Sequence, residues 1–277
     1  MWKLFLASPL FLLLYFCACK QEKASSTLIS AKNKLNQSGD SILALDFLLE
    51  EGPHWDWVEE VEISDPARKS KQRYKAFPLK KVLDIWLQRD SLDVENTSLI
   101  FECKDGYSPA ISYQKMLPHT AYLSFHSLDT DETQLWPESI KEQFSPFYLV
   151  WTDLAKGEKG WPWPYGLTHI RLKNTQNTFA AAKPDPSLAL EKGYELFKAR
   201  CMKCHQINKV GGNMGPELNH PKSITEYMAK ADLLAFVQNP QSYRYNSKMP
   251  AVLGLKEEEL EQIYQYLLHM SSRKISE

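Results

Sequence analysis

Five consecutive residues in the C-terminal third of the chain have the types and spacing to do chemistry together: Cys201-Met202-Lys203-Cys204-His205. Two thiols separated by two residues can each add to a vinyl group of one porphyrin and form thioethers. The histidine that follows is then held beneath the iron, where its imidazole is an axial ligand. The spacing therefore predicts one covalently attached c-type haem. A redox-active pair of cysteines, or half of a zinc site, that happens to precede a histidine is the alternative.

A haem iron of this kind takes a sixth ligand, for which Met249, just before Pro250, is the candidate. Its thioether is a soft ligand, and a His/Met pair raises the reduction potential. Met214 competes with it, but it follows His205 by only nine positions, where the chain must stay on the proximal side. In the same loop, we expect the carbonyl of Pro216 to bind the far ring nitrogen of His205 and to orient the ring.

Helices are expected on both sides of this motif. Asp185-Pro186 predicts a helix start, with a side-chain cap followed by proline in the first turn. Gly193, on the apolar face of that helix, predicts a close crossing with another helix. A short helix is expected over 232–237, and a last one begins with three glutamates, 257–259, which suit the helix dipole. The predicted buried stripe of the last helix consists of Leu260, Ile263, Tyr264, Leu267 and Met270.

Residues 187–277 resemble the class I cytochrome c family. The similar features are the Gly193/Phe197 helix, Cys201-x-x-Cys204-His205, Gly215-Pro216-x-Leu218, Met249-Pro250 and the terminal helix with Tyr266-Leu267. The resemblance implies a small all-α fold around one haem c. Lysines at the haem edge (Lys203, Lys209, Lys248) would then be a docking face for a redox partner protein, although we favour an ordinary solvated surface.

The N-terminus indicates export. A basic start, Met1-Trp2-Lys3, precedes an apolar run from Leu4 to Phe16, which predicts a signal peptide over 1–18. The residues before Cys19 resemble a loose bacterial lipobox, so we expect Cys19 to carry a lipid, with an ordinary secretory signal cut near Ala18 as the alternative. Residues 19–41 are polar and predict a flexible tether. The expected location is the periplasmic side of a bacterial envelope, anchored to a membrane.

Residues 42–173 are long and apolar enough to form one domain. Apolar alternation predicts strands at 57–63, 98–103, 147–151 and 167–172, and a helix at 79–87 with Leu79, Val82, Leu83 and Trp86 on one face. Asp105-Gly106 predicts a tight turn. The loop Trp161–Gly166 is rich in aromatic residues and is expected to pack either on its own domain or against the haem domain or a partner. A linker is expected over 174–186.

This middle segment resembles the molybdopterin-binding domain of the sulfite oxidase type, an α+β fold. The similar pieces are Phe77-Pro78-Leu79, Phe101-x-Cys103-x-Asp105-Gly106-Tyr107 and Pro146 to Val150. Catalytic members of that family bind molybdenum through a cysteine upstream of the first piece, and residues 42–76 contain none. The resemblance therefore implies a relative without molybdopterin, used for structure or docking. Cys103 is expected to be a buried free thiol.

Together these features predict a multidomain chain, with an α+β middle domain followed by an all-α cytochrome c domain. The expected function is an exported monohaem electron carrier, not an enzyme. A molybdenum-dependent oxidoreductase that passes electrons to its own haem is the alternative, and it would need Cys103 as a metal ligand. A haem-based sensor is another, and it would need a labile sixth ligand. With 33 basic and 34 acidic residues, a net charge of -1 and no basic run, we expect no nucleic-acid partner.

Overall fold

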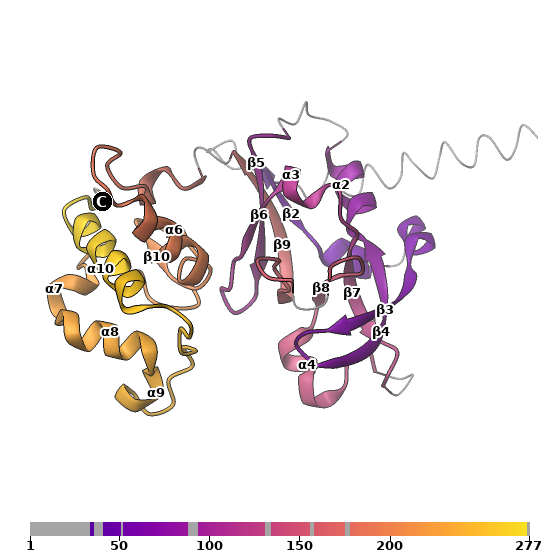
Figure 1. The fold of residues 1–277 in the computed structure, drawn as a ribbon. Helices are drawn as coiled ribbons and strands as arrows, with labels where there is room; N and C mark the ends of the chain where they lie inside the picture. The colour runs from indigo at the N-terminus through magenta and orange to yellow at the C-terminus, as the bar shows by residue number, and fades with distance from the viewer. Residues whose placement is uncertain are drawn as a thin grey trace, which may run out of the picture.

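The computed structural model describes residues 34–35, 41–50, 52–87, 94–130, 134–155, 158–174 and 178–275. The predicted signal peptide and Cys19 lie outside these ranges, as does most of the predicted tether. Within the described ranges, no helix has both the length and the apolar character needed to cross a membrane. Figure 1 shows two lobes, a β-rich lobe up to residue 174 and a helical lobe from residue 178 onward.

The β-rich lobe is built on one antiparallel sheet that curves into a half-barrel. Its strands are β1 (Lys34–Leu35), β2 (Ser41–Ala44), β3 (Glu59–Asp65), β4 (Ser70–Pro78), β5 (Thr97–Cys103), β6 (Ala110–Ser112), β7 (Ala121–Ser127), β8 (Phe147–Trp151) and β9 (Tyr165–Asn174). The strand order is β1-β2-β9-β8-β7-β4-β3, and β5 pairs with both β9 and β6. The ten-residue β9 is the hub of the sheet, because it pairs with β2, β5 and β8.

Short helices and turns complete this lobe: η1 (Asp46–Leu49), η2 (Pro53–Trp57), α2 (Leu79–Leu87), α3 (Tyr113–Met116) and α4 (Glu138–Phe144). The predicted helix at 79–87 is confirmed, and the four apolar residues expected on one face are the buried ones. Three of the four predicted strands are also confirmed, within β5, β8 and β9. The strand predicted at 57–63 starts later than expected, at Glu59, because Pro53–Trp57 forms a 3-10 helix.

Two long strands, β4 and β7, were not predicted. In β4, alternate residues such as Tyr74 and Ala76 are buried, but charged residues occupy the intervening positions and obscure the pattern. The sheet also begins earlier than expected, because β1, which lies inside the segment predicted as a tether, pairs with β2. The β-rich architecture is consistent with one separate domain, while its resemblance to the sulfite oxidase type stays a prediction.

The aromatic loop folds over its own domain. The ring of Trp161 lies 4.8 Å from that of Trp151 and 4.3 Å from that of His119, measured between centroids. The Trp151 indole donates a hydrogen bond of 2.7 Å to the carbonyl of Pro162, and Trp163 packs against the same core. Of the two alternatives left open by the sequence, the structure therefore has the loop that packs on its own lobe.

The helical lobe contains η3 (Ala180–Ala182), α6 (Glu191–Arg200), α7 (Ile224–Tyr227), α8 (Lys230–Gln238), α9 (Pro240–Tyr243) and α10 (Glu257–Ser271). A small hairpin of β10 (Gln206–Ile207) and β11 (Val210–Gly211) follows α6. The close crossing predicted at Gly193 is confirmed: a side chain there would overlap the backbone of Gln262 and lie 3.1 Å from Cβ of Tyr266, both on α10. The three glutamates do occupy the first turn of α10.

Two details of this lobe differ from the prediction. The helix expected at Asp185-Pro186 begins at Glu191, because the Asp185 carboxylate accepts hydrogen bonds from Ser187 and caps a separate turn instead. In the buried stripe of α10, Tyr266 takes the place of Tyr264, which is only partly buried. The Tyr266 hydroxyl donates a hydrogen bond of 2.7 Å to the carbonyl of Ala182.

This contact also shortens the predicted linker. Thr178 and Ala182 are buried, and the Lys198 ammonium lies 4.9 Å from the ring centroid of Phe179. From residue 178 onward, the chain is therefore part of the helical lobe.

Candidate functional site

A helix end and a tight turn bring the two thiols and the imidazole of the pentad together. Cys201 is the C-cap of α6, and its amide donates to the carbonyl of Phe197 at 2.8 Å. The amides of Cys204 and His205 in turn donate to the carbonyl of Cys201, at 3.0 and 2.9 Å. Both thiols are half-buried and neither is in a disulfide. The end of α6 and the turn that follows it therefore hold both thiols and the imidazole.

The two thiols are protonated at neutral pH in this environment. Burial raises the pKa of Cys201 to about 12, and it also raises the pKa of Cys204. Redox-active cysteine pairs react as thiolates and normally have lowered pKa values. The raised pKa values therefore do not favour a dithiol redox motif.

The ring of His205 is fixed on two sides. Its Nδ1 lies 2.9 Å from the carbonyl oxygen of Pro216. Because a carbonyl can only accept, Nδ1 carries a proton, and Nε2 is the ring nitrogen that could bind a metal. Gly215 packs against the same ring: a Cβ at this position would lie 2.6 Å from Nδ1 and 2.8 Å from Nε2. The hydrogen bond that we expected from the sequence is therefore present, and glycine is the one residue that fits beside the ring.

The loop that follows the pentad is held by a buried polar network that sequence analysis missed. The Asn208 amide donates to the carbonyls of Ala181 and Arg273, at 2.9 and 2.8 Å. The Asn219 amide, which is fully buried, donates to Asn208 Oδ1 at 2.8 Å and to the carbonyl of Met270 at 2.7 Å. Asn208 has a positive φ of 53°, a backbone conformation that asparagine tolerates. This tolerance is the one local signal that agrees with the position of Asn208 in the network.

The two candidate methionine ligands, Met249 and Met214, lie in different environments. Met249 is half-buried in the loop between α9 and α10, and its carbonyl accepts a hydrogen bond of 3.0 Å from the Gln241 amide. Met214 is 46% exposed, and its backbone lies beside Gly106 of the β-rich lobe. The amide of Gly215, its neighbour, donates to the carbonyl of Cys204 at 2.8 Å. Met214 therefore belongs to the pentad side of the lobe.

The comparisons with known proteins agree with this geometry. The family model described as cytochrome c matches residues 190–271. These residues form a cytochrome c domain. A cytochrome c of Theileria annulata is 29% identical over 114 residues, and one of Theileria parva is 28% identical over the same length. Each alignment covers 99% of the relative but 33% of this chain. The similarity thus extends over a whole small cytochrome and only a third of the present protein.

Membership of this domain in the cytochrome c family implies covalently bound haem c. The residues present fit that group. The free thiols of Cys201 and Cys204 stand at the thioether positions, and the imidazole of His205 is oriented with Nε2 available. Cys201 itself packs against the apolar core cluster of this lobe, as do the partly buried residues Leu218, Met228, Val237 and Leu255.

Cys103, which the molybdenum alternative requires, lies in the main apolar core of the β-rich lobe. Burial, followed by the nearby Asp105 carboxylate, raises the pKa of this thiol, so it stays protonated. Among the described residues, no cluster of three or more His, Cys, Asp or Glu side chains could hold a metal ion. This cysteine is therefore suited to packing.

The β-rich lobe touches the pentad directly through the turn after β5. The amide of Ser108 donates to the carbonyl of Lys203 at 2.9 Å, and the amide of Asn213 donates to the carbonyl of Gly106 at 3.0 Å. Gly106 has φ +88°, and a Cβ there would overlap the Asn213 side chain and lie 2.7 Å from the backbone nitrogen of Met214. The predicted tight turn at Asp105-Gly106 is confirmed, and it serves as an interdomain contact.

Tyr107 extends this contact toward the cysteines. Burial raises the pKa of the Tyr107 hydroxyl, and the Cys204 thiol is close enough to contribute to the shift. The same turn therefore stands beside the haem attachment residues, with its other end in the core of the β-rich lobe.

Proposed function

We propose that this protein is an exported, lipid-anchored monohaem cytochrome that carries single electrons between redox partner proteins. The observation that carries the proposal is the pentad geometry: two free, half-buried thiols and a histidine whose Nδ1 is bound to the carbonyl of Pro216. Haem bound there supplies one-electron chemistry, the interconversion of ferric and ferrous iron. Cys201 and Cys204 would hold it by thioethers, and His205 would be its proximal ligand.

The residues around the histidine keep it in one orientation. The Pro216 carbonyl and Gly215 restrain the imidazole. With haem bound, Nε2 would therefore face one direction in both oxidation states. A ligand that does not move between oxidation states lowers the structural change that accompanies electron transfer. We infer that the Gly215-Pro216 loop serves this purpose.

Met249 is our proposed sixth ligand. Its loop is restrained, because the Gln241 amide binds the carbonyls of both Ser247 and Met249, at 3.3 and 3.0 Å. Met214, the competitor, is supported less well because its loop is tied to the pentad side and to the β-rich lobe. With two protein ligands, no coordination position would remain for a substrate or a gas, which favours a carrier over an enzyme or a sensor.

The β-rich lobe is proposed to be an accessory, non-catalytic domain that covers the haem attachment loop. Its turn makes two backbone hydrogen bonds with residues 203 and 213 and fits there only with glycine at position 106. Covering this loop would exclude water from one edge of the haem site, and lower solvent exposure raises the reduction potential.

Export and lipid anchoring through Cys19 are supported by the sequence alone, since both features lie outside the described residues. An exported location agrees with the attachment of c-type haem, which bacteria carry out outside the cytoplasm. Labelling of intact cells with radioactive palmitate, compared between wild type and Cys19→Ala, tests the lipid. Absence of label in the wild type would refute lipidation and leave the cytochrome proposal intact.

The main experiment is absorption spectroscopy of the oxidised and reduced protein, produced with c-type haem maturation. We expect a weak ferric band near 695 nm, which reports methionine bound to ferric haem. Met249→Ala should abolish the band, whereas the matched variant Met214→Ala should retain it. Loss in Met214→Ala alone would assign the ligand to Met214. A wild type without the band, or one that binds carbon monoxide at neutral pH when reduced, would refute His/Met ligation and favour a sensor.

A further inference from the structure

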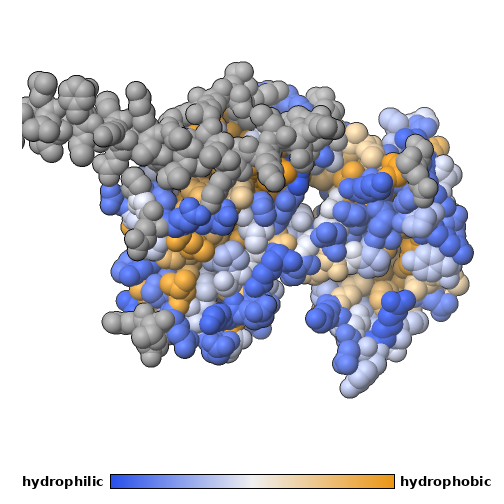
Figure 2. Space-filling view, turned by 180° about the vertical axis from the view of Figure 1, so that it is seen from behind, coloured by the Kyte–Doolittle hydropathy of each residue, from blue (hydrophilic) through white to orange (hydrophobic). Residues whose placement is uncertain are grey.

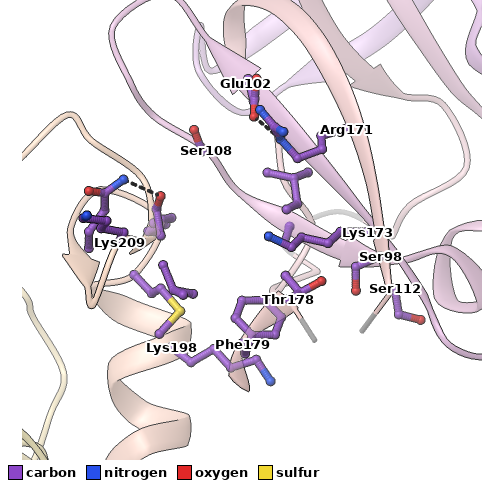
Figure 3. A pocket seen from close by; sticks show the side chains of 17 residues that line it. Ser98, Glu102, Ser108, Ser112, Arg171, Lys173, Thr178, Phe179, Lys198 and Lys209 are labelled. Carbon is purple, nitrogen blue, oxygen red and sulfur yellow. Dashed lines mark hydrogen bonds and ion pairs between the residues drawn. The ribbon is translucent and has the colours of Figure 1, made fainter. Parts of the chain in front are cut away.

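A cleft of about 460 Å³ lies between the two lobes. Strands β5, β6 and β9 form one wall, and α6 with the β10–β11 hairpin forms the other (Figure 3). In Figure 2 the lobes meet at a narrow contact, with hydrophilic residues on both sides of the groove between them. The volume falls within the range typical of small-molecule sites, about 300–1,000 Å³.

The lining of the cleft has more basic than acidic side chains, although the chain as a whole does not. Five basic side chains line it: Arg171, Lys173, Lys198, Lys203 and Lys209. Among the described lining residues, the one carboxylate is that of Glu102, which is paired with Arg171 at 2.6 Å; Lys198 is paired with Glu195, which lies outside the lining, at 3.4 Å. The whole chain has 33 basic and 34 acidic residues, so the excess is local. Positive charges that converge on a concave surface focus the field and attract an anion.

The cations come from both lobes. Arg171 and Lys173 lie on β9, and they point toward the cleft in Figure 3. Lys198 lies on α6, Lys203 within the pentad, and Lys209 at the turn of the β10–β11 hairpin. An anion bound between them would therefore contact both domains at once.

Hydroxyl groups accompany the charges. Four hydroxyl residues also line the cleft: Ser98, Ser108, Ser112 and Thr178. Phe179 forms an apolar surface at one end, beside Lys198. The hydroxyl of Ser108 already donates to the carbonyl of Gly106 at 3.3 Å, and that of Thr178 to the carbonyl of Asn174 at 2.6 Å. The ammonium groups are therefore the main donors for anionic oxygens, and such charged hydrogen bonds are the stronger kind.

We propose that this cleft binds one small polyanion, a molecule with two or more carboxylate or phosphate groups, and that the bound anion bridges the two lobes. The proposal goes beyond electron transfer, because it requires neither a redox reaction nor a particular haem ligand. Carboxylate and phosphate share the oxygens that lysine, arginine and hydroxyl groups recognise. The experiment below distinguishes a polycarboxylate from a phosphate compound as the ligand.

Isothermal titration calorimetry of the full-length protein at low ionic strength tests the proposal, with citrate in one series and pyrophosphate in the other. We expect one-to-one binding for at least one of them, and the one that binds more tightly identifies the source. Lys198→Gln should weaken binding about tenfold, which is the loss of about 1.4 kcal/mol. The matched variant Lys192→Gln, at an exposed position on the same helix, should bind as the wild type does.

A second pair of variants tests the other wall. Lys173→Gln on β9 should also weaken binding about tenfold, whereas Lys81→Gln, exposed on α2, should not. No binding of either anion would overturn the proposal. Equal weakening by the cleft variants and their controls would overturn it too, because the attraction would then be a general property of the surface. Since calorimetry detects binding without a redox readout, failure here leaves the proposed electron carrier untouched.

Discussion

Replacing Gly106 by alanine should uncouple the two lobes. The residue has φ +88°, where an L side chain costs about 1–2 kcal/mol. The new Cβ would overlap Asn213 and lie 2.7 Å from the nitrogen of Met214, so the turn must move away. The two interdomain hydrogen bonds would then be lost, at about 0.5–1.5 kcal/mol each. The expected total is about 2–5 kcal/mol, of which about 1–3 kcal/mol is interdomain coupling.

Gly160→Ala is the matched control. Gly160 lies in the same lobe as Gly106, and its φ of +85° is almost the same. A Cβ at Gly160 meets only the end of Lys115, at 3.7 Å. It should therefore show the backbone cost alone, about 1–2 kcal/mol. The difference in the free energy of unfolding between the two variants measures the contact of the β-rich lobe with the haem attachment loop.

Urea unfolding followed by two probes separates the lobes. Tryptophan fluorescence reports the β-rich lobe, because all described tryptophans lie there, and haem absorption reports the helical lobe. In the wild type the two transitions should coincide, and in Gly106→Ala they should separate. The reduction potential should also fall, because the attachment loop becomes exposed to water. Equal losses in the two glycine variants, with coincident transitions in both, would refute the interdomain contact.

Further predictions concern single residues and the bound anion. Gly215→Ala should displace the ring of His205, so that the fraction of purified protein with covalent haem falls, as measured by the pyridine haemochrome spectrum. Asn219→Ala removes two buried hydrogen bonds and should lower the free energy of unfolding by about 2–3 kcal/mol in urea. Burial, with Lys75 nearby, lowers the pKa of His126, so the unfolded chain binds the proton more readily. Stability should therefore decline as the pH falls through about 6.5, and thermal unfolding of His126→Gln should show a smaller decline. A polyanion in the cleft should stabilise ferric haem and lower the midpoint potential in redox titration, whereas an unchanged potential would mean that the cleft and the haem are not coupled.

Local chemistry made much of the haem domain predictable. The pentad, the proline that binds His205 and the glycine of the helix crossing each depend on residues close in sequence or on one face of one helix. The same holds for α2 in the β-rich lobe, whose four apolar positions recur at helical spacing. The predicted start of α6 was wrong because the Asp185 side chain can cap either a helix or a separate turn, and the sequence does not distinguish the two.

Contacts between distant residues were decided by the tertiary structure alone. The turn at Asp105-Gly106 was expected as a turn, but nothing in its sequence indicated that it would bind the haem attachment loop almost a hundred positions later. The buried Asn208 and Asn219, and the five cations of the cleft, are likewise brought together from separate elements. The amino-acid pattern determines which short segments form helices, strands and a covalent cofactor motif, because those depend on near neighbours. Which of their surfaces meet depends on the packing of whole domains, since the energy of each long-range contact exists only once both partners are folded.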